Sequence, residues 1–336
     1  MNQKAQTLED IARLAGVSTS TVSRALNDSS LINDETKERI QKIAREHHFR
    51  INASARNLRV KQSHTIAFVM PASETDFFFA ESLFSFEILG GIGKGLSSFG
   101  YDLMMIHVDP DDDAWVSSYF DSARVDGFIL KGIHLQQSHI EKLVELNAPF
   151  ICWGVPLSNY SYPTVMGDDI TGGRLATQHL IDFGREKIAF LGGPKDDLTV
   201  QHRFNGYQAA LQAANRAVDP KLVVYGDYSH PSGVTAMQNL LKKSPDVDAV
   251  FANSDLMAIG AIQVIKESGK RVPEDIAVVG YDDVSIAKYN NLPLTTIRQN
   301  VPLAGRLLAE NLIQYIKTGV VTNVTTPVEL IVRESA

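Results

Sequence analysis

The chain is poor in cysteine, tryptophan and long apolar runs. Of its 336 residues, one is cysteine and two are tryptophan. A single cysteine, Cys152, excludes an internal disulfide framework and fits a reducing compartment. The N-terminus is polar and shows no signal-peptide pattern, and no apolar run reaches transmembrane length. These absences predict a cytoplasmic protein with no membrane partner.

Signatures of metal sites and of common enzymes are also missing. The nine histidines lack the spacing of zinc ligands, and Cys152 has no second cysteine as a partner. The glycine-rich stretch at residues 90–95 misses the dinucleotide fingerprint by one residue and lacks the Ser or Thr of a P-loop. We expect it to be a small-residue face of a helix. No G-x-S-x-G elbow is present. The sequence therefore predicts no metal, no cofactor and no catalytic residue.

Charge is distributed unevenly along the chain. Residues 1–62 hold 11 Lys and Arg against 7 Asp and Glu, so 11 − 7 gives +4, while the remainder holds 21 against 32, which gives −11. Hydrophobic residues make up 44% of the chain and charged residues 21%, which is an ordinary composition for a globular protein. The length is sufficient for two or three domains. A basic head on an acidic body is typical of a phosphate-binding module attached to a part that does not touch DNA.

Residues 7–27 have the pattern of two short helices joined by a tight turn. Thr7 can cap the first helix, with Asp10 completing a near capping box. Gly16 permits the sharp turn, and Ser18 can cap the second helix. The expected buried positions are Leu8, Ile11, Ala12, Ala15, Val22, Ala25 and Leu26. This pattern predicts a helix-turn-helix whose second helix enters a major groove.

A third helix should follow, from an Asn33 cap to about His47, with Ile40, Ile43 and Ala44 as its apolar positions. Residues 52–58 have the pattern of a short, weak helix that should fold only against a partner. The alternative for residues 7–47 is a three-helix bundle that binds a protein.

From Thr65 onward, short apolar strands alternate with helical stretches. Strands are predicted at residues 66–70, 101–108, 127–130, 150–153, 188–191, 222–225, 249–252 and 276–279, and near the C-terminus at 328–332. The alternation predicts right-handed crossovers and parallel sheets covered on both faces. So many strands favour two lobes, and we expect the chain to cross between them near Pro163 and Pro293.

Polar and aromatic side chains gather where these strands end. They are Asp168, Asp227, Tyr228, Asn253, Ser254, Asp255, Asp282 and Asp283, while Arg203 opens a helix beyond the strand at 188–191. Open parallel sheets bind ligands at such ends. Carboxylates, an amide, an arginine and aromatic rings suit a polyhydroxylated ligand in a cleft. Asp255 and Asp283 could instead cap helices or brace loops, and Trp153 could instead belong to the core.

Several blocks together resemble the lactose-repressor (LacI/GalR) family of bacterial transcription regulators. They are residues 7–27, Asn52-x-x-Ala55-Arg56-x-Leu58, Arg203-x-x-Gly206-Tyr207, and residues 254–261, 279–283 and 293–299. The chain departs from the family at Phe49 and Ile51, where tyrosine and proline are usual.

The resemblance implies an all-α helix-turn-helix head plus an α/β effector domain of two doubly wound parallel-sheet lobes, periplasmic-binding-protein-like. We expect a DNA-binding domain at 1–50, a hinge helix and linker at 51–63, and an effector-binding and dimerisation domain at 64–336. Within the last, one lobe should span about 64–163 and 293–322, and the other about 164–292 and 323–336.

DNA contacts are predicted in three groups. Base readers are Thr19, Ser20 and Arg24. Phosphate contacts are Thr7, Ser18, Thr21, Ser23, Asn27, Asn33 and Thr36. The resemblance adds the hinge residues Asn52, Ala55, Arg56 and Leu58, and it implies that Leu58 wedges into the minor groove. Taken alone, Leu58 could be an ordinary linker residue.

Effector contacts are implied at Arg203, Tyr228, Ser254 and Asp282, although many relatives have asparagine at the position of Ser254. Counting back from Gly91 places an aromatic contact at Phe84, with Phe78 and Phe79 as alternatives. Trp153 is a further candidate at a strand end.

We therefore predict a homodimeric DNA-binding regulator, favouring a repressor, whose affinity for a near-palindromic operator is controlled by a small-molecule effector, a sugar rather than a purine. A dimer is favoured because C-terminal heptads are absent. The main alternative is a sugar- or nucleoside-processing enzyme with an appended helical domain, which would have no use for the hinge. A free-standing transport binding protein is disfavoured by the missing secretion signal.

Overall fold

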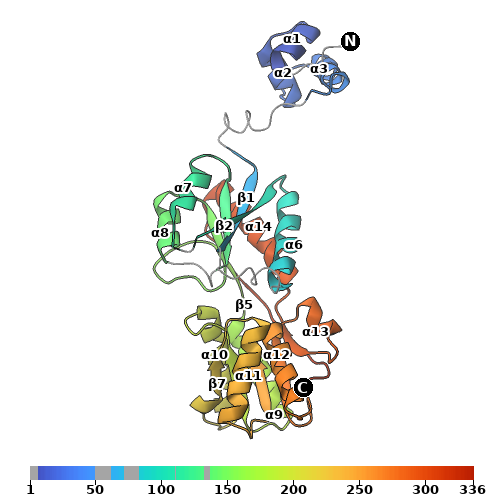
Figure 1. The fold of residues 1–336 in the computed structure, drawn as a ribbon. Coiled ribbons are helices and arrows are strands. Elements are labelled where there is room, and N and C mark those ends of the chain that lie inside the picture. The colour runs from blue at the N-terminus through green and yellow to red at the C-terminus, as the bar shows by residue number, and fades with distance from the viewer. Residues whose placement is uncertain (1–6, 50–61, 72–82, 110, 132–136) are drawn as a thin grey trace. The chain divides into compact units, whose positions relative to one another are not determined.

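The computed structural model describes residues 7–49, 62–71, 83–109, 111–131 and 137–336. The chain divides into two compact units, Met1–Ser63 and His64–Ala336. The second unit contains two six-stranded sheets, each the centre of one lobe (Figure 1).

The first unit contains three helices, α1 (Leu8–Ala15), α2 (Thr19–Leu26) and α3 (Asp34–Glu46). The predicted caps are all present. Thr7 and Asp10 form a complete capping box, and Gly16 has φ 64° at the turn. The side chains of Ser18 and Asn33 accept hydrogen bonds from the first turns of α2 and α3. Local sequence therefore fixes where each of these helices begins.

The three helices pack around a small core of Ile11, Ala12, Ala15, Val22, Ala25 and Ile40, with Leu8, Leu26 and Ile43 partly buried against it. These positions match the expected apolar stripes, so the helix-turn-helix prediction is confirmed. Because the apolar residues of α2 are all on one side, its polar residues remain on the surface.

The first lobe has the strand order β11-β5-β4-β3-β1-β2, and every neighbouring pair is parallel. The strands are β1 (Thr65–Pro71), β2 (Asp102–Val108), β3 (Gly127–Lys131), β4 (Phe150–Trp153), β5 (Thr164–Gly167) and β11 (Asn323–Thr326). Helices α6 (Leu83–Ser97) and α14 (Val301–Thr318) cover one face, and α7 (Ala114–Phe120) and α8 (Gln137–Glu145) cover the other (Figure 1).

The second lobe has the strand order β12-β10-β9-β8-β6-β7, parallel except for the edge pair β10 and β12. Its strands are β6 (Ile188–Gly192), β7 (Val223–Tyr225), β8 (Ala249–Ala252), β9 (Ala277–Asp282), β10 (Thr295–Arg298) and β12 (Glu329–Ile331). Its helices are α9 (Asp169–Asp182), α10 (Leu198–Ala213), α11 (His230–Lys243), α12 (Asp255–Glu267) and the short α13 (Ser285–Tyr289). The 3-10 turn Pro220–Leu222 precedes β7.

The predicted lobe limits, 64–163 with 293–322 and 164–292 with 323–336, are wrong by one strand at each crossing. β5 pairs with β4 in the first lobe, β10 pairs with β9 in the second, and β11 pairs with β5 in the first. The chain therefore crosses after Gly167, after Arg298 and after Thr326. None of these three strands has more than two consecutive apolar residues, so no hydrophobic run marked them.

The glycine-rich stretch at residues 90–95 lies within α6, as expected. A Cβ at Gly91 would overlap the backbone carbonyl of Pro302, and one at Gly305 would overlap that of Ile88. The absent side chains let α6 and α14 approach backbone to backbone.

Candidate functional site

The outer surface of α2 carries the predicted base readers. Thr19, Ser20 and Arg24 are exposed, whereas Val22 and Ala25 on the same helix are buried. A recognition helix needs this division, because one side must pack while the other meets base edges.

The first turn of α2 also carries linked hydroxyl groups. The Oγ of Ser18 lies 2.8 Å from the Oγ of Ser20 and 2.8 Å from the Oγ1 of Thr21. Near the helix end, the Nδ2 of Asn27 donates to the backbone oxygen of Ser23 at 2.7 Å. These groups are preordered donors and acceptors of the kind that contact phosphates.

The structure describes some of the remaining predicted DNA contacts and leaves out others. Thr7 and Asn33 are exposed caps of α1 and α3, and Thr36 is half-buried at the start of α3. The hinge residues Asn52, Ala55, Arg56 and Leu58 lie outside the described residues, so their contacts stay predictions.

Contacts within the second unit bring the C-terminal strand ends of its two lobes together. The carboxylate of Glu87 on α6 accepts hydrogen bonds from Ser285 on α13, and Gly154 after β4 lies near Thr199 on α10. We call the polar and aromatic residues at these ends the interlobe site: Phe84, Lys131 and Trp153 from the first lobe, and Asp169, Asp197, Arg203, Tyr228, Asn253, Ser254, Asp282 and Gln299 from the second.

Arg203 lies at the centre of the second-lobe side. Its Nε donates to Asp169 at 2.8 Å, its Nη1 donates to the backbone oxygen of Asn253 at 2.6 Å, and its guanidinium lies 3.7 Å from the ring centroid of Tyr281. Burial lowers the pKa of Arg203, but Asp169, Tyr281, Tyr228 and Asp282 together outweigh it, and the pKa is raised overall. Burial raises the pKa of Asp169 despite the opposing charge of Arg203. The geometry is that of a tight, buried ion pair.

Asp168 was the residue predicted at this position, and Asp169 was missed. The structure uses Asp168 as the cap of α9, where its Oδ1 accepts from the amide of Thr171 at 3.1 Å. A cap needs only one carboxylate, so the doubled Asp168-Asp169 was the available signal that the second had another role.

Asp282 lies at the end of β9 and is 9% exposed. Its Oδ1 accepts a hydrogen bond from the Nε2 of Gln299 at 2.6 Å. Burial raises the pKa of Asp282 to about 7, although Arg203 and Gln299 oppose the shift. Arg203 and Asp282 therefore share one buried charged cluster, but the ion-pair partner of Arg203 is Asp169.

Tyr228 and Ser254 are held by internal contacts. The hydroxyl of Tyr228 donates to Asp197 at 2.7 Å. The Oγ of Ser254 donates to the backbone oxygen of Tyr228 at 2.8 Å and accepts from the amide of Met257 at 3.1 Å. The side chain of the neighbouring Asn253 is fully buried, and neither of its polar atoms has a hydrogen-bond partner among the described residues. Many relatives have asparagine at the position of Ser254; in this chain the side-chain amide belongs to the preceding residue, Asn253.

The first lobe contributes aromatic rings and a cation. The rings of Phe84 and Trp153 are 5.9 Å apart, and the Nζ of Lys131 lies 5.4 Å from the Phe84 centroid. The same Nζ donates to the Oγ of Ser85 at 3.1 Å. Burial lowers the pKa of Lys131 to about 8, against the charges of Asp282 and Asp197. Phe78 and Phe79, the alternative aromatics, lie outside the described residues.

Lys131 was not among the predicted site residues. It pairs in register with Trp153 at the ends of β3 and β4, where a polar residue follows the apolar run Gly127–Leu130. That position, the last residue of a strand whose other residues are all buried, was the signal that could have identified it.

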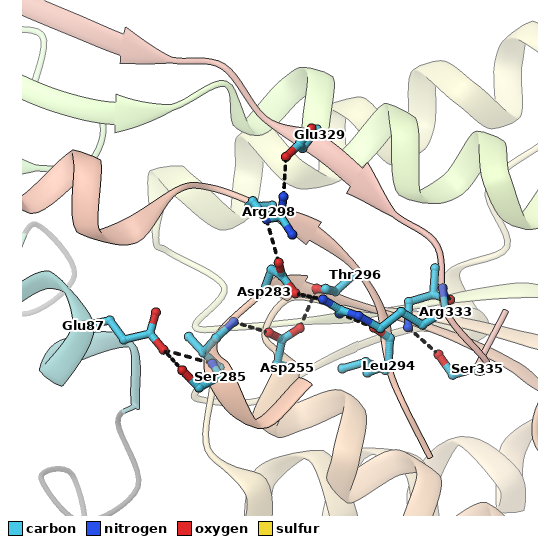
Figure 2. A network of polar contacts seen from close by, with 12 residues as sticks. Glu87, Asp255, Asp283, Ser285, Leu294, Thr296, Arg298, Glu329, Arg333 and Ser335 are labelled. Carbon is cyan, nitrogen blue, oxygen red and sulfur yellow. Dashed lines mark hydrogen bonds and ion pairs between the residues drawn. The ribbon is translucent and has the colours of Figure 1, made fainter. Parts of the chain in front are cut away.

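Asp255 and Asp283 brace the loop between β9 and α13, which was one of the two roles left open for them (Figure 2). Asp255 accepts from the amide of Val284 at 2.9 Å and from the hydroxyl of Thr296. Asp283 forms ion pairs with Arg298 at 2.7 Å and with Arg333 at 2.5 Å.

Metal sites and membrane spans are both absent from the described part of the chain. It contains no group of three or more His, Cys, Asp or Glu residues that could hold a metal ion. No helix in it is both long and apolar enough to span a membrane.

Comparison with known families divides the chain as the structure does. Residues 7–52 match the description "Bacterial regulatory proteins, lacI family", and residues 63–334 match "Periplasmic binding proteins and sugar binding domain of LacI family". The transcriptional regulator CelR of Thermobifida fusca is 38% identical, over 97% of this chain and 95% of that protein.

Two solved structures extend the likeness to three dimensions. A CelR–cellobiose complex matches with a TM-score of 0.77 and 36% identity, over 98% of this chain and 99% of that one. A lac repressor dimer bound to operator and an anti-inducer matches with a TM-score of 0.85 and 28% identity, over 98% of both chains. The predicted fold class and the choice of regulator over enzyme are thereby confirmed, and the chain belongs to the lacI family of bacterial regulatory proteins.

Proposed function

We propose that this regulator is a homodimeric, cytoplasmic repressor whose operator affinity is controlled by a neutral sugar bound at the interlobe site. The observation that carries the proposal is the pairing of two chemistries across the lobes. Phe84 and Trp153 contribute aromatic rings from the first lobe, while Arg203 and Asp282 contribute charged groups from the second. Sugars need both, because their hydroxyls bond to charged groups and their apolar faces stack on rings.

Charge balance favours a neutral ligand over an acidic one. The cations Lys131 and Arg203 are accompanied by three carboxylates, those of Asp169, Asp197 and Asp282. An anionic ligand would add a further negative charge to a largely buried cluster that already has its counter-ions. Cellobiose is the first sugar to test, because a structure of the similar CelR contains it.

For the head, we propose that Thr19, Ser20 and Arg24 read bases in the major groove and that the hydroxyls of Ser18 and Thr21 contact phosphates. A homodimer would place two such heads on a near-palindromic operator. The lac repressor dimer on its operator supports this arrangement. Asn52, Ala55, Arg56 and Leu58 are proposed to form the hinge, with Leu58 wedged into the minor groove.

The test uses the full-length protein and an operator selected from a random DNA library. Thermal shift and calorimetry with cellobiose, ribose and adenine should show binding of a sugar only. The bound sugar should change operator affinity about 5- to 150-fold, the usual range of allosteric coupling.

Asp282→Asn is the matching site variant. It should weaken sugar binding about ten- to a hundredfold, because it removes a charged hydrogen-bond partner, and leave sugar-free operator binding unchanged. Binding of adenine alone, or a bound sugar with no effect on operator affinity, would contradict the proposal.

A further inference from the structure

One hydrogen-bonded contact joins the two lobes close to the interlobe site. The Oε1 of Glu87, on α6 of the first lobe, accepts from the amide of Ser285 at 2.9 Å and from its Oγ at 2.7 Å (Figure 2). Ser285 is the first residue of α13 in the second lobe. A single carboxylate oxygen thus holds both donors of a residue 198 positions away in sequence.

The sequence of α13 explains why an outside acceptor is needed. The first amides of any helix have no acceptor within it, and a polar N-cap side chain usually supplies one. Here the N-cap is Val284, which makes no side-chain hydrogen bond. Glu87 supplies an acceptor for the amide of Ser285 from the other lobe, so this contact exists only while the lobes are in this arrangement.

The same short turn carries Asp282, the proposed effector contact. Asp282 has φ 113° and Asp283 has φ 57°, so two residues with side chains adopt left-handed backbone. Each position of the turn is held by another side chain: Asp282 by Gln299, Asp283 by Arg298 and Arg333, Val284 by Asp255, and Ser285 by Glu87. Of these holding side chains, Glu87 alone comes from a helix of the first lobe.

We propose that Glu87 is a positioning residue that fastens the turn at residues 282–285 from the opposite lobe, and so holds Asp282 where the effector meets it. The effector part of this inference rests on the proposed function. Glu87 and the effector then favour the same lobe arrangement, so each strengthens the binding of the other.

The contact itself is tested without any ligand, by hydrogen–deuterium exchange of the full-length protein. Glu87→Ala removes the acceptor, so amides in peptides covering residues 283–289 should exchange about three- to tenfold faster. Glu87→Gln keeps a carbonyl oxygen and should stay near wild type. Ser285→Ala keeps the amide donor and should have a smaller effect. Unchanged exchange in Glu87→Ala overturns the proposal.

Glu145→Ala is the matched control, because Glu145 is an exposed glutamate of the same lobe that pairs with Lys142 in its own helix. It should leave exchange at residues 283–289 unchanged. A melting curve for each variant confirms that it is folded. If Glu145→Ala accelerates exchange at this turn as Glu87→Ala does, the effect is not specific to the interlobe contact and the proposal fails.

The positioning role is tested by calorimetry with cellobiose. Glu87→Ala should weaken binding about three- to tenfold, and Glu87→Gln should restore it to within about twofold of wild type. Wild-type affinity in Glu87→Ala, together with faster exchange, would refute the positioning role. Failure of the wild type to bind cellobiose or any other sugar would count against the proposed function, while the exchange experiment would still decide the contact.

Discussion

Single side chains at the interlobe site have structural roles beside their proposed roles in effector binding. Arg203 is paired with Asp169, bonded to the backbone of Asn253 and stacked on Tyr281. Removing Arg203 would leave a buried carboxylate without its partner, which costs about 3–5 kcal/mol in comparable cases. A loss of effector binding in Arg203→Ala would therefore be ambiguous. Asp282 is the cleaner probe, because its hydrogen-bond partner Gln299 is neutral.

The raised pKa of Asp282 predicts a pH-dependent stability. In the folded protein its pKa is about 7, whereas an unfolded aspartate titrates near an ordinary value of about 3.9. Between these values the folded state holds a proton that the unfolded state has lost. The contribution therefore stabilises the protein at low pH and is lost as pH rises through about 7. Arg203, Lys131, Asp169 and Gln299 surround the carboxylate and set the midpoint.

Asp282→Asn removes this titration, so the variant should gain melting temperature relative to wild type as pH rises from about 5 to 8. Melting curves at four pH values measure the difference. Asp248→Asn is a control, since Asp248 is an aspartate near the protein surface that accepts two backbone amides. A difference between Asp282→Asn and wild type that stays constant with pH would show that this carboxyl does not titrate in that range.

At the scale of elements, apolar runs made most of the fold predictable. The runs at 188–191 and 249–252 correctly located buried strands, and the caps Thr7, Ser18 and Asn33 located helix starts. The short strands β5, β10 and β11 were not predicted, because none has more than two consecutive apolar residues, and β11 is placed by pairing with the sequence-distant β5. Asp169 and Lys131 were missed for a related reason, since partners from other elements give them their roles.

The pairing of α6 with α14 gives a prediction about packing. Gly91→Ala places a Cβ against the backbone carbonyl of Pro302, which cannot rotate away as a side chain could. Overpacking of this kind should destabilise the protein by about 1–3 kcal/mol. Gly93, two residues along the same helix, has nothing within 4 Å of a Cβ. Gly93→Ala should instead stabilise by about 0.5–1 kcal/mol, because alanine favours helix.

Urea unfolding of the two variants measures both effects, with Gly93→Ala as the internal control for helix propensity. Equal stability of Gly91→Ala and Gly93→Ala would mean that α6 and α14 separate at no cost, contrary to the close backbone contact seen here.

At the scale of the whole molecule, charge and fold divide at nearly the same place. Residues 1–62 carry a charge of 11 − 7 = +4 and the rest 21 − 32 = −11, while the compact units separate between Ser63 and His64. The two matched family descriptions follow the same division. DNA reading and effector binding should therefore be separable by mutation, although the regulator couples them.

The last prediction tests this separation at the recognition helix. Thr19→Ala with Ser20→Ala removes two exposed hydroxyls of α2 and should change which operator bases are preferred, at a cost of about 1–3 kcal/mol for each base-edge interaction that is removed. The fold should survive, because Ser18 keeps its hydrogen bond to Thr21. Thr36→Ala is the matched control, since removal of a proposed phosphate contact should weaken all sequences alike. An operator-library selection measures the consensus, and calorimetry measures effector affinity, which should equal that of wild type in both variants. An unchanged consensus in the double variant would refute the assignment of Thr19 and Ser20 as base readers, and a changed effector affinity would refute the separation of the two units.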